Sequence, residues 1–273
     1  MPSTTRSSVW STAGYASLSF DFWRDFTLDG GGRYNWEQKE MDFLLTNTAG
    51  TFPDDPNETW SQPTGTVRLT YRFREDTHVY WKYTRGWKPG TFNATSSTVQ
   101  DPLTGIPHAN IAIADPETID AYETGVRGGW FEGRLGLDLS VFYYNYHDYQ
   151  LFTAQQFAGG QPEFVILNAD QAEVYGAELD AVLRPWLGAF LNVRFGWPES
   201  QFLDFVQLQQ DIILVGNEQV TVNRELNNTG NPLLNSPKFK VSLTAEQTLP
   251  LGRWGALTAR YDGVWTDTTF YDA

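Results

Sequence analysis

The sequence predicts an all-β protein: a fragment of an antiparallel, up-and-down transmembrane β-barrel with about ten long strands. Three observations support this fold class. Apolar residues recur at every second position, the predicted strands are long, and short turns alternate along the chain with long polar connections. The composition agrees, because 15% of the residues are aromatic and only 2 are Met, and aromatic residues favour strands.

The alternation is clearest over residues 134–146. Leu135, Leu139 and Tyr143 fall on one face of the predicted strand, whereas Asp138 and Tyr144 fall on the other. A period of two is the signature of a strand that has one apolar face. The same pattern recurs over residues 66–74, 175–184, 239–246 and 257–262. We therefore expect a sheet with one continuous apolar side.

The pattern predicts strands at about 12–23, 26–37, 65–74, 77–87, 119–131, 134–147, 173–184, 188–197, 238–248 and 254–266. Most are longer than the usual strand of about 5–6 residues. Short turns with Gly, Pro or Asp are expected at 23–25, 74–76, 131–133, 185–187 and 250–252. The long polar connections are 38–64, 88–118, 148–172 and 198–237. One end of the sheet should thus carry short turns and the other end long loops.

This asymmetry favours a membrane barrel, with short periplasmic turns and long extracellular loops, over a soluble β-sandwich. Aromatic residues lie near both ends of the strands, as in the two interfacial girdles of a barrel. Near the short turns they are Trp23, Trp130, Trp186 and Trp254, and near the far ends Tyr83, Trp87, Tyr143 and Trp265. The sequence therefore predicts that the apolar side contacts outer-membrane lipid.

Composition and motifs exclude several classes of function. The formal charge is 19 − 33 = −14, so no basic footprint for nucleic acid is expected. There is no Cys, and His78, His108 and His147 are isolated from one another, so we expect no metal site and no cofactor. No catalytic constellation is found, and an enzyme is not expected. The start has no apolar core of a secretory signal, so either the protein stays inside the cell or these residues are an internal piece of a longer exported chain.

Two segments resemble a known family. Residues 79–93, VYWKYTRGWKPGTFN, resemble the signature "vYasyarGfksGgfN" of TonB-dependent outer-membrane receptors. Residues 115–127, DPETIDAYETGVR, are similar to that family's "PEtvdsYEvGlK" strand. Shorter matches follow the family order at residues 28–34 (LDGGGRY), 168–169 with 174–179 (NA, VYGAEL) and 230–238 (GNPLLNSPK). Five matches in order make the likeness specific.

The resemblance implies a closed barrel of about 22 strands in the outer membrane of a Gram-negative bacterium. It also implies a plug domain inside the barrel, coupling to the TonB system through an N-terminal box, and a small-molecule ligand such as a metal chelate. Residues 1–273 depart from that pattern, because they carry no plug, no TonB box and no closing strand. We interpret them as one partial receptor barrel domain, incomplete at both ends.

Charged residues on the face opposite the apolar one are predicted to face the lumen, since Arg or Lys against lipid costs about 2–4 kcal/mol. The predicted lumen or plug-contacting residues are Arg33, Arg68, Arg72, Lys82, Glu123, Arg127, Glu178, Asp180, Arg194, Lys240, Glu246 and Arg260. Substrate contact is expected from aromatic residues near the long loops, because binding residues concentrate on loops held by a rigid scaffold. These are Trp87, Tyr144, Tyr146, Tyr149 and Phe152.

The functional hypothesis is a receptor for TonB-dependent uptake of a ferric siderophore or another scarce nutrient, with the cargo class taken from the family alone. The alternative is a soluble, acidic, aromatic-rich β-protein that binds or hydrolyses carbohydrate with aromatic platforms and two carboxylates. A passive porin is a third hypothesis, and only the family motifs argue against it.

Overall fold

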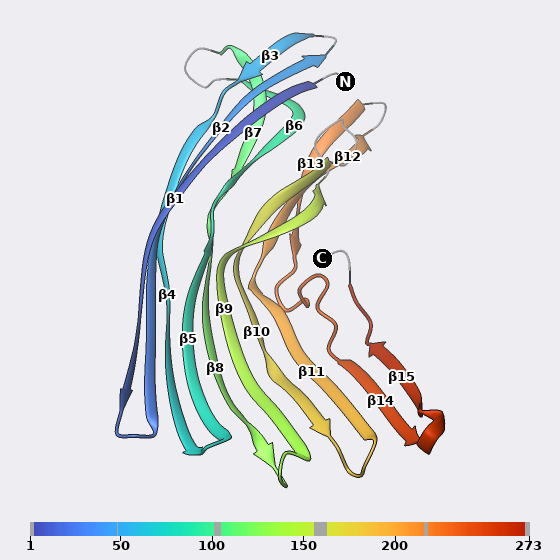
Figure 1. The fold of residues 1–273 in the computed structure, drawn as a ribbon. Helices are drawn as coiled ribbons and strands as arrows, with labels where there is room; N and C mark the ends of the chain where they lie inside the picture. The colour runs from blue at the N-terminus through green and yellow to red at the C-terminus, as the bar shows by residue number, and fades with distance from the viewer. Residues whose placement is uncertain (1–2, 48, 101–104, 156–162, 216–217, 271–273) are drawn as a thin grey trace.

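A computed structural model describes residues 3–47, 49–100, 105–155, 163–215 and 218–270. Its main sheet is antiparallel and has eleven strands: ten follow one another in the order β1-β2-β4-β5-β8-β9-β10-β11-β14-β15, and the short β3 pairs with β2 (Figure 1). These ten strands are β1 (Ser3–Phe22), β2 (Phe26–Asn47), β4 (Asn57–Arg74), β5 (Thr77–Lys88), β8 (Glu117–Trp130), β9 (Leu135–Gln155), β10 (Glu163–Leu183), β11 (Ala189–Asp204), β14 (Lys240–Pro250) and β15 (Ala256–Thr266). The predicted number of strands and their up-and-down order are confirmed.

The sheet is a curved, open wall with β1 and β15 at its two edges (Figure 1). The barrel is therefore not closed by these residues. Five short turns lie together at one end of the wall, which we call the turn end. Two of these turns place consecutive residues at positive φ, Trp23 with Arg24 and Phe131 with Glu132. Positive φ at both central positions is what a tight hairpin turn requires, because it matches the twist of the flanking strands.

The predicted long loops are largely strands, which corrects the predicted strand ends. At the other end of the wall, called here the mouth, β2 continues to Asn47 instead of stopping near residue 37. The connections contain β3 (Gly50–Asp54), β6 (Thr91–Gln100), β7 (Pro107–Ala114), β12 (Val206–Val215) and β13 (Glu218–Asn227). β6 with β7 and β12 with β13 form separate two-stranded hairpins. Strands form here because pairing within each hairpin satisfies the backbone N–H and C=O groups.

The apolar side of the wall is uncovered in the described structure. Trp81, Tyr122, Leu139 and Leu257 are 50%, 52%, 39% and 57% exposed. No second sheet or helix packs on that side among the described residues, and the only helix there is the single 3-10 turn Gly252–Trp254. A soluble β-sandwich would bury this face, so the arrangement is that of a wall whose apolar side contacts lipid.

A row of tyrosines marks where the apolar side ends. Tyr83, Tyr122, Tyr143 and Tyr175 are direct partners on four adjacent strands, β5, β8, β9 and β10. Two residues further toward the mouth the same face becomes charged or polar, with Arg85, Asp120, Asn145 and Glu173. Aromatic residues of this kind mark the interface between lipid and water in membrane barrels. We take this tyrosine row as the boundary of the membrane-spanning part.

Buried apolar clusters occur only toward the mouth in the part of the chain that the structure describes. One, the β9–β11 cluster, contains Leu151, Ala169, Ala172, Phe202, Phe205 and Leu233. The other, the β2–β7 cluster, contains Phe43, Leu45 and Ala109, with Met41, Phe52 and Ile111 packed against it. The described helix is too short to cross a membrane, and no other helix long and apolar enough to do so is found in these residues.

Candidate functional site

The predicted lumen residues share one face of the wall, opposite the apolar side, as alternation requires. Arg68, Lys82 and Glu123 are direct partners on β4, β5 and β8. The ammonium of Lys82 lies 2.7 Å from Oε2 of Glu123, and the hydroxyl of Tyr80 donates to Oε1 at 2.5 Å. The Arg68 guanidinium lies over the Tyr80 ring, 4.5 Å from its centroid. The polar face therefore carries a charge network that crosses three strands.

A second charged row lies nearer the turn end. Arg127 on β8 is 3.5 Å from Asp138 on β9, and Arg194 on β11 is 3.0 Å from Asp180 on β10. Because these strands are neighbours in the sheet, both ion pairs tie adjacent strands together. Two more predicted residues have local partners: Arg260 pairs with Asp262 at 2.8 Å, and Arg33 donates to Asn35 at 2.7 Å.

Five of the predicted lumen residues, Arg68, Arg72, Glu178, Lys240 and Glu246, have no side-chain hydrogen bond or ion pair within the described ranges. Glu178 and Lys240 line a hollow of about 700 Å³ on the polar face, together with Glu123, Asp138 and Arg194. Among the described side chains, Nε of Arg68 is buried without a partner. The polar face thus presents unsatisfied charges of both signs to whatever fills the barrel.

The five predicted substrate-contacting aromatic residues do not form one site. Tyr144 stacks on Phe142 on the polar face, with 4.8 Å between ring centroids. Tyr146 and Tyr149 meet edge to face at 5.3 Å and pack on the β9–β11 cluster. Trp87 lies on the same face of β5 as Tyr83, which is opposite to the face that carries Tyr144. Phe152 is 63% exposed and stacks on Phe164.

The base of the β6–β7 hairpin has a geometry that the sequence interpretation missed. The ladder between β5 and β8 ends at the pair Lys88 and Glu117, and β6 pairs again with β7 from Thr91 and Ala114. The positions between them place Pro89 opposite Pro116. Neither proline has an N–H, so the ladder cannot continue through this pair. The two prolines therefore form a hinge at which the hairpin leaves the wall.

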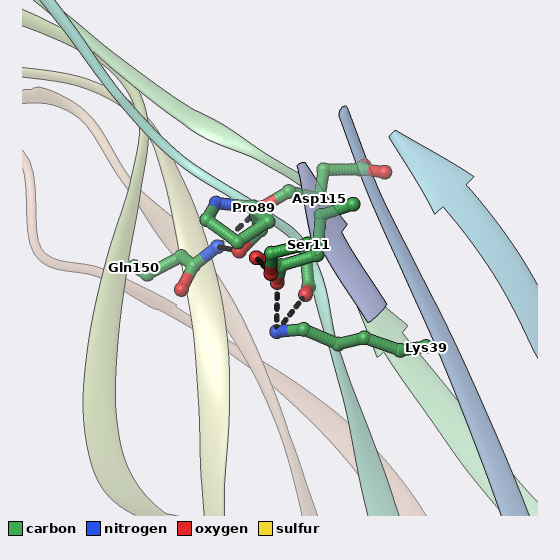
Figure 2. Close-up of polar contacts among 7 residues, drawn as sticks. Ser11, Lys39, Pro89, Asp115 and Gln150 are labelled. Carbon is green, nitrogen blue, oxygen red and sulfur yellow. Dashed lines mark hydrogen bonds and ion pairs between the residues drawn. The ribbon is translucent and has the colours of Figure 1, made fainter. Parts of the chain in front are cut away.

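Side chains from other strands satisfy the backbone at this hinge (Figure 2). Nε2 of Gln150 on β9 donates to the carbonyl of Pro89 at 2.9 Å and to that of Asp115 at 2.7 Å. Nζ of Lys39 on β2 donates to the carbonyl of Gly90 at 2.8 Å and lies 3.3 Å from Glu37, which accepts from Ser11. The hinge is thus held from both sides of the hairpin.

Asn168 on β10 completes the hinge. Its Oδ1 accepts from the N–H of Asp115 at 2.8 Å, and its Nδ2 donates to the carbonyls of Asp115 and Asp148. Gly90 is required by the close packing here, because a Cβ at this position would lie 2.6 Å from both the Ala114 carbonyl and the Trp60 ring. Asn168 thus satisfies the backbone on one side of the hinge, and the close approach of Trp60 and Ala114 leaves no space for a side chain at Gly90.

Two carboxyl groups at the mouth, beyond the tyrosine row, have altered pKa values. Burial raises the pKa of Glu117, although the N–H of Gln150 donates to its carboxylate at 2.7 Å. Burial also raises the pKa of Asp148, and the nearby charges of Asp115 and Asp170 add to the effect.

Asp148 has φ +53°, in the left-handed region. In β9 the odd-numbered side chains change from exposed, at Tyr143, to buried, at Leu151, across this residue.

Sequence reasoning did not assign a role to Lys39, Asn93, Gln150 or Asn168. The signal in the sequence was the pair Pro89 and Pro116. These two prolines lie opposite each other if the pairing of β5 with β8 continues in the same register into β6 and β7. No group of three or more His, Asp or Glu side chains in the described residues is arranged to hold a metal ion.

Together, the uncovered apolar side, the charged opposite face, the short turns at one end and the hairpins at the other define the wall of an outer-membrane-type β-barrel. The family model described as TonB dependent receptor-like, beta-barrel, matches residues 2–273. The chain therefore belongs to the TonB-dependent receptor β-barrel family, as the sequence motifs indicated.

Individual relatives agree with this assignment. The chain is 23% identical over 184 residues to the pesticin receptors of Yersinia enterocolitica and Yersinia pestis, which covers 67% of this chain and 25% of theirs. Its fold is similar to the ferric yersiniabactin uptake receptor FyuA of Yersinia pestis, with a TM-score of 0.74 and 20% identity over 99% of this chain and 36% of that one. The siderophore receptor PiuA of Acinetobacter baumannii matches with a TM-score of 0.65 and 17% identity, over 96% of this chain and 34% of PiuA.

The chain thus spans about a quarter of the length of the curated relatives and about a third of the similar structures. The family consists of transport receptors, not enzymes. Its barrels are located in the outer membrane of Gram-negative bacteria, which places this chain there too. The alternative of a soluble carbohydrate-binding protein disagrees with both the uncovered apolar side and the family.

Proposed function

We propose that this chain forms part of the barrel wall of a longer outer-membrane receptor that imports a ferric siderophore by TonB-dependent transport. The observation that carries the proposal is the polar face with its unpaired charges. Arg72, Glu178 and Lys240 have no ion partner among the described residues, and charges in such a setting are stabilised by partners or water. In a passive pore, water alone would solvate these charges. In a receptor barrel, side chains of a plug domain would pair with them.

A plug domain would meet these charges from inside the barrel. Glu178 and Glu123 line the same hollow of about 700 Å³, and both are acceptors for basic side chains. Lys240 and Arg72 would donate hydrogen bonds to acidic partners. The plug and its coupling to TonB lie outside the described residues and belong to this proposal.

The cargo is proposed to be a ferric siderophore because the structural relatives include a ferric yersiniabactin uptake receptor and a siderophore receptor. Tyr144, Tyr146 and Tyr149 are the aromatic residues of this chain that we propose near its route. They lie on the polar face or pack at the mouth. Trp87 and Phe152 remain predicted contacts, but they lie apart from this group.

The test expresses the full-length protein in an Escherichia coli strain that lacks its own siderophore receptors. Uptake of ⁵⁵Fe is measured with phenolate, catecholate and hydroxamate ferric complexes, with and without a functional TonB. We expect uptake of at least one complex that requires both the receptor and TonB. The double variant Tyr144→Ala with Tyr146→Ala should lower the apparent affinity for that complex, while Phe152→Ala should not.

Two results would contradict the proposal. Equal uptake without TonB would indicate a passive pore, and a protein that fractionates with the soluble proteins of the cell would exclude the barrel wall. Unchanged affinity in the tyrosine variant would remove only the proposed cargo contact.

A further inference from the structure

The negative charge of this chain is concentrated at the mouth. By register, the tyrosine row continues to Val67 on β4, Gly30 on β2 and Glu199 on β11. The mouth comprises Glu199, its ion partner Lys238 and the residues beyond this level, which are 3–17, 31–66, 84–121, 144–174 and 200–237. Among its described side chains, 16 are acidic and 7 are basic, a formal charge of 7 − 16 = −9. The described side chains toward the turn end give 12 − 13 = −1.

Few of the mouth carboxylates have a cationic partner. The ion pairs between described residues of the mouth are Glu37 with Lys39, Asp54 with His108, Asp120 with Arg85 and Glu199 with Lys238. Asp55, Glu58, Asp115, Asp148 and Asp170 form no ion pair with a described residue. Water and mobile ions have to compensate these charges, so the mouth keeps a negative potential.

Three of these carboxylates lie close enough to act on one another. The charges of Asp115 and Asp170 add to burial in raising the pKa of Asp148. Gln150 lies beside them, because its N–H donates to Glu117 and its Nε2 to the carbonyl of Asp115. Gln150 is 7% exposed, and its Oε1, which points away from the hinge in Figure 2, accepts no hydrogen bond from the described residues. A buried acceptor and unpaired carboxylates both favour a cationic or N–H-bearing group at this place.

Aromatic side chains at the mouth favour the same sign of charge. Phe152 and Phe164 stack with 5.3 Å between ring centroids and are 63% and 71% exposed. The ammonium of Lys39 lies 5.8 Å from the centroid of the Trp60 ring. The face of an aromatic ring attracts cations because its quadrupole is negative there. The exposed Phe152–Phe164 pair therefore offers a second surface that suits a positive group.

Ferric complexes of similar size differ in charge according to their chelating groups. Three catecholates, each doubly negative, give a trianionic complex. Three hydroxamates, each singly negative, give a neutral complex, and an appended ammonium makes it cationic. A surface potential of several kT changes the encounter rate of a charged ligand by about 10–10³-fold, and the effect grows with the charge of the ligand.

We propose that this chain's part of the mouth selects cargo by charge, favouring neutral and cationic metal complexes and repelling polyanionic ones. The inference rests on the proposed transport function and specifies its substrate class. Its basis is the difference in charge between the mouth and the rest of the wall, together with the unpaired carboxylates around Gln150.

The first experiment measures the potential at the mouth without any cargo, in the full-length protein in a neutral detergent. A nitroxide is attached at Phe152→Cys at the mouth or at Leu187→Cys, a turn-end position that is 91% exposed. This chain has no Cys, and any Cys elsewhere in the receptor is replaced by Ser. Collision with trianionic tris(oxalato)chromate is compared with collision with a neutral nickel chelate. We expect the anionic-to-neutral ratio to be about fivefold lower at Phe152 than at Leu187.

Salt and charge variants identify the source of the difference. The two ratios should converge at about 1 M salt, where the Debye length is about 3 Å. Asp115→Asn with Asp170→Asn should raise the ratio at Phe152 about twofold or more at low salt. The control, Glu75→Gln with Glu132→Gln, removes the same charge from two short turns and should leave that ratio unchanged. If the mouth variant fails to fold, Asp55→Asn with Glu58→Gln replaces it.

Equal ratios at Phe152 and Leu187 at low salt would overturn the proposal, because the mouth would then have no repulsive potential. The same conclusion follows if the turn-end control raises the ratio at Phe152 as much as the mouth variant does.

The second experiment asks whether the potential selects cargo. The ferric complex that the receptor takes up in the ⁵⁵Fe assay is prepared with a free ammonium or with the same amine succinylated, so that only the sign of the added charge differs. We expect an apparent KM about tenfold lower for the ammonium form at low salt. The mouth variant should reduce this difference, and the turn-end control should keep it.

Equal KM values for the two forms, or preferred uptake of the ferric tricatecholate, would overturn selection by charge. Absence of TonB-dependent uptake of every complex would refute the proposed transport function instead, while the collision measurement would still decide whether the mouth repels anionic chelates.

Discussion

The strands of this protein are stabilised differently on the two sides of the tyrosine row. Between the row and the turn end, the backbone ladder from β8 through β9 to β10 is continuous, and side chains such as Leu139 and Trp81 remain exposed on the apolar side. Between the row and the mouth, the described residues include the buried clusters, with Phe202 and Ala172 at 0% exposure. Toward the turn end, lipid supplies the apolar surroundings. Toward the mouth, the protein has to build its own core.

This difference explains why the proline hinge, with its side-chain-to-backbone contacts, lies at the mouth. In lipid, each backbone group needs an intramolecular partner, so the ladder cannot be interrupted. Beyond the lipid, the ladder stops at Pro89 and Pro116, and Gln150 and Lys39 satisfy the freed carbonyls. The lipid therefore requires an unbroken backbone ladder in the membrane-spanning part, whereas the ladder can be interrupted at the mouth.

The largest expected effect is the difference in stability between an Arg placed against lipid and an Arg placed at the mouth. Leu139→Arg places a guanidinium on the apolar side within the membrane and should destabilise the full-length protein by about 2–4 kcal/mol. Phe152→Arg, beyond the tyrosine row at a side chain that is 63% exposed, should be nearly neutral. Urea titration of the protein folded into phospholipid vesicles measures both. Equal losses in the two variants would contradict the assigned membrane boundary.

A second pair of variants compares protein packing with lipid packing. Phe202→Ala removes a fully buried ring from the β9–β11 cluster and should cost about 3–5 kcal/mol, because the cavity cannot refill. Phe195→Ala lies on the lipid-facing side, where acyl chains can occupy the space, and should cost clearly less. Limited proteolysis should show cleavage at the mouth only in the first variant. A larger loss for Phe195→Ala would argue that the apolar side is packed by protein.

Substituting Gly by Ala compares how closely the backbone is packed at the hinge and in the wall. A Cβ on Gly90 would lie 2.6 Å from the Ala114 carbonyl and from Trp60, whereas a Cβ on Gly32 would meet nothing within 4 Å. Gly90→Ala should therefore destabilise by about 1–3 kcal/mol through overpacking, and Gly32→Ala should change little. Thermal unfolding in detergent compares them. Similar melting temperatures for the two variants would show that the hinge tolerates displacement.

The smallest expected effect concerns charge at the mouth. Because burial and nearby acids raise the pKa of Asp148, ionising this carboxyl opposes folding. The wild type should thus lose this part of its stability as the pH rises through the raised pKa. Asp148→Asn keeps a residue that tolerates positive φ and should raise Tm at pH 7. The difference should vanish in acid, where Asp148 is neutral. A gain that persists at low pH would point to another cause.

Much of the wall was predictable, because alternation is a direct consequence of strand geometry. The alternation of apolar and polar residues placed Arg68, Lys82 and Glu123 on one face. In the structure these residues are cross-strand neighbours, and Lys82 forms an ion pair with Glu123. The same reasoning failed beyond the tyrosine row. It ended β2 near residue 37 although the strand continues to Asn47. It also grouped Trp87 with Tyr144, although alternation places these residues on opposite faces. Polar hairpins carry little apolar alternation, so their strands leave a weak pattern.

By itself the sequence determined the fold class, the ten-strand wall and the family, because period, strand length and motif order are local properties of the chain. Only the tertiary structure decided how the mouth is assembled. Gln150 meets Pro89 across 61 positions and Asn93 meets Ile166 across 73, and no local pattern specifies such contacts. They depend on where the prolines turn the β6–β7 hairpin and on which backbone groups that turn leaves without partners.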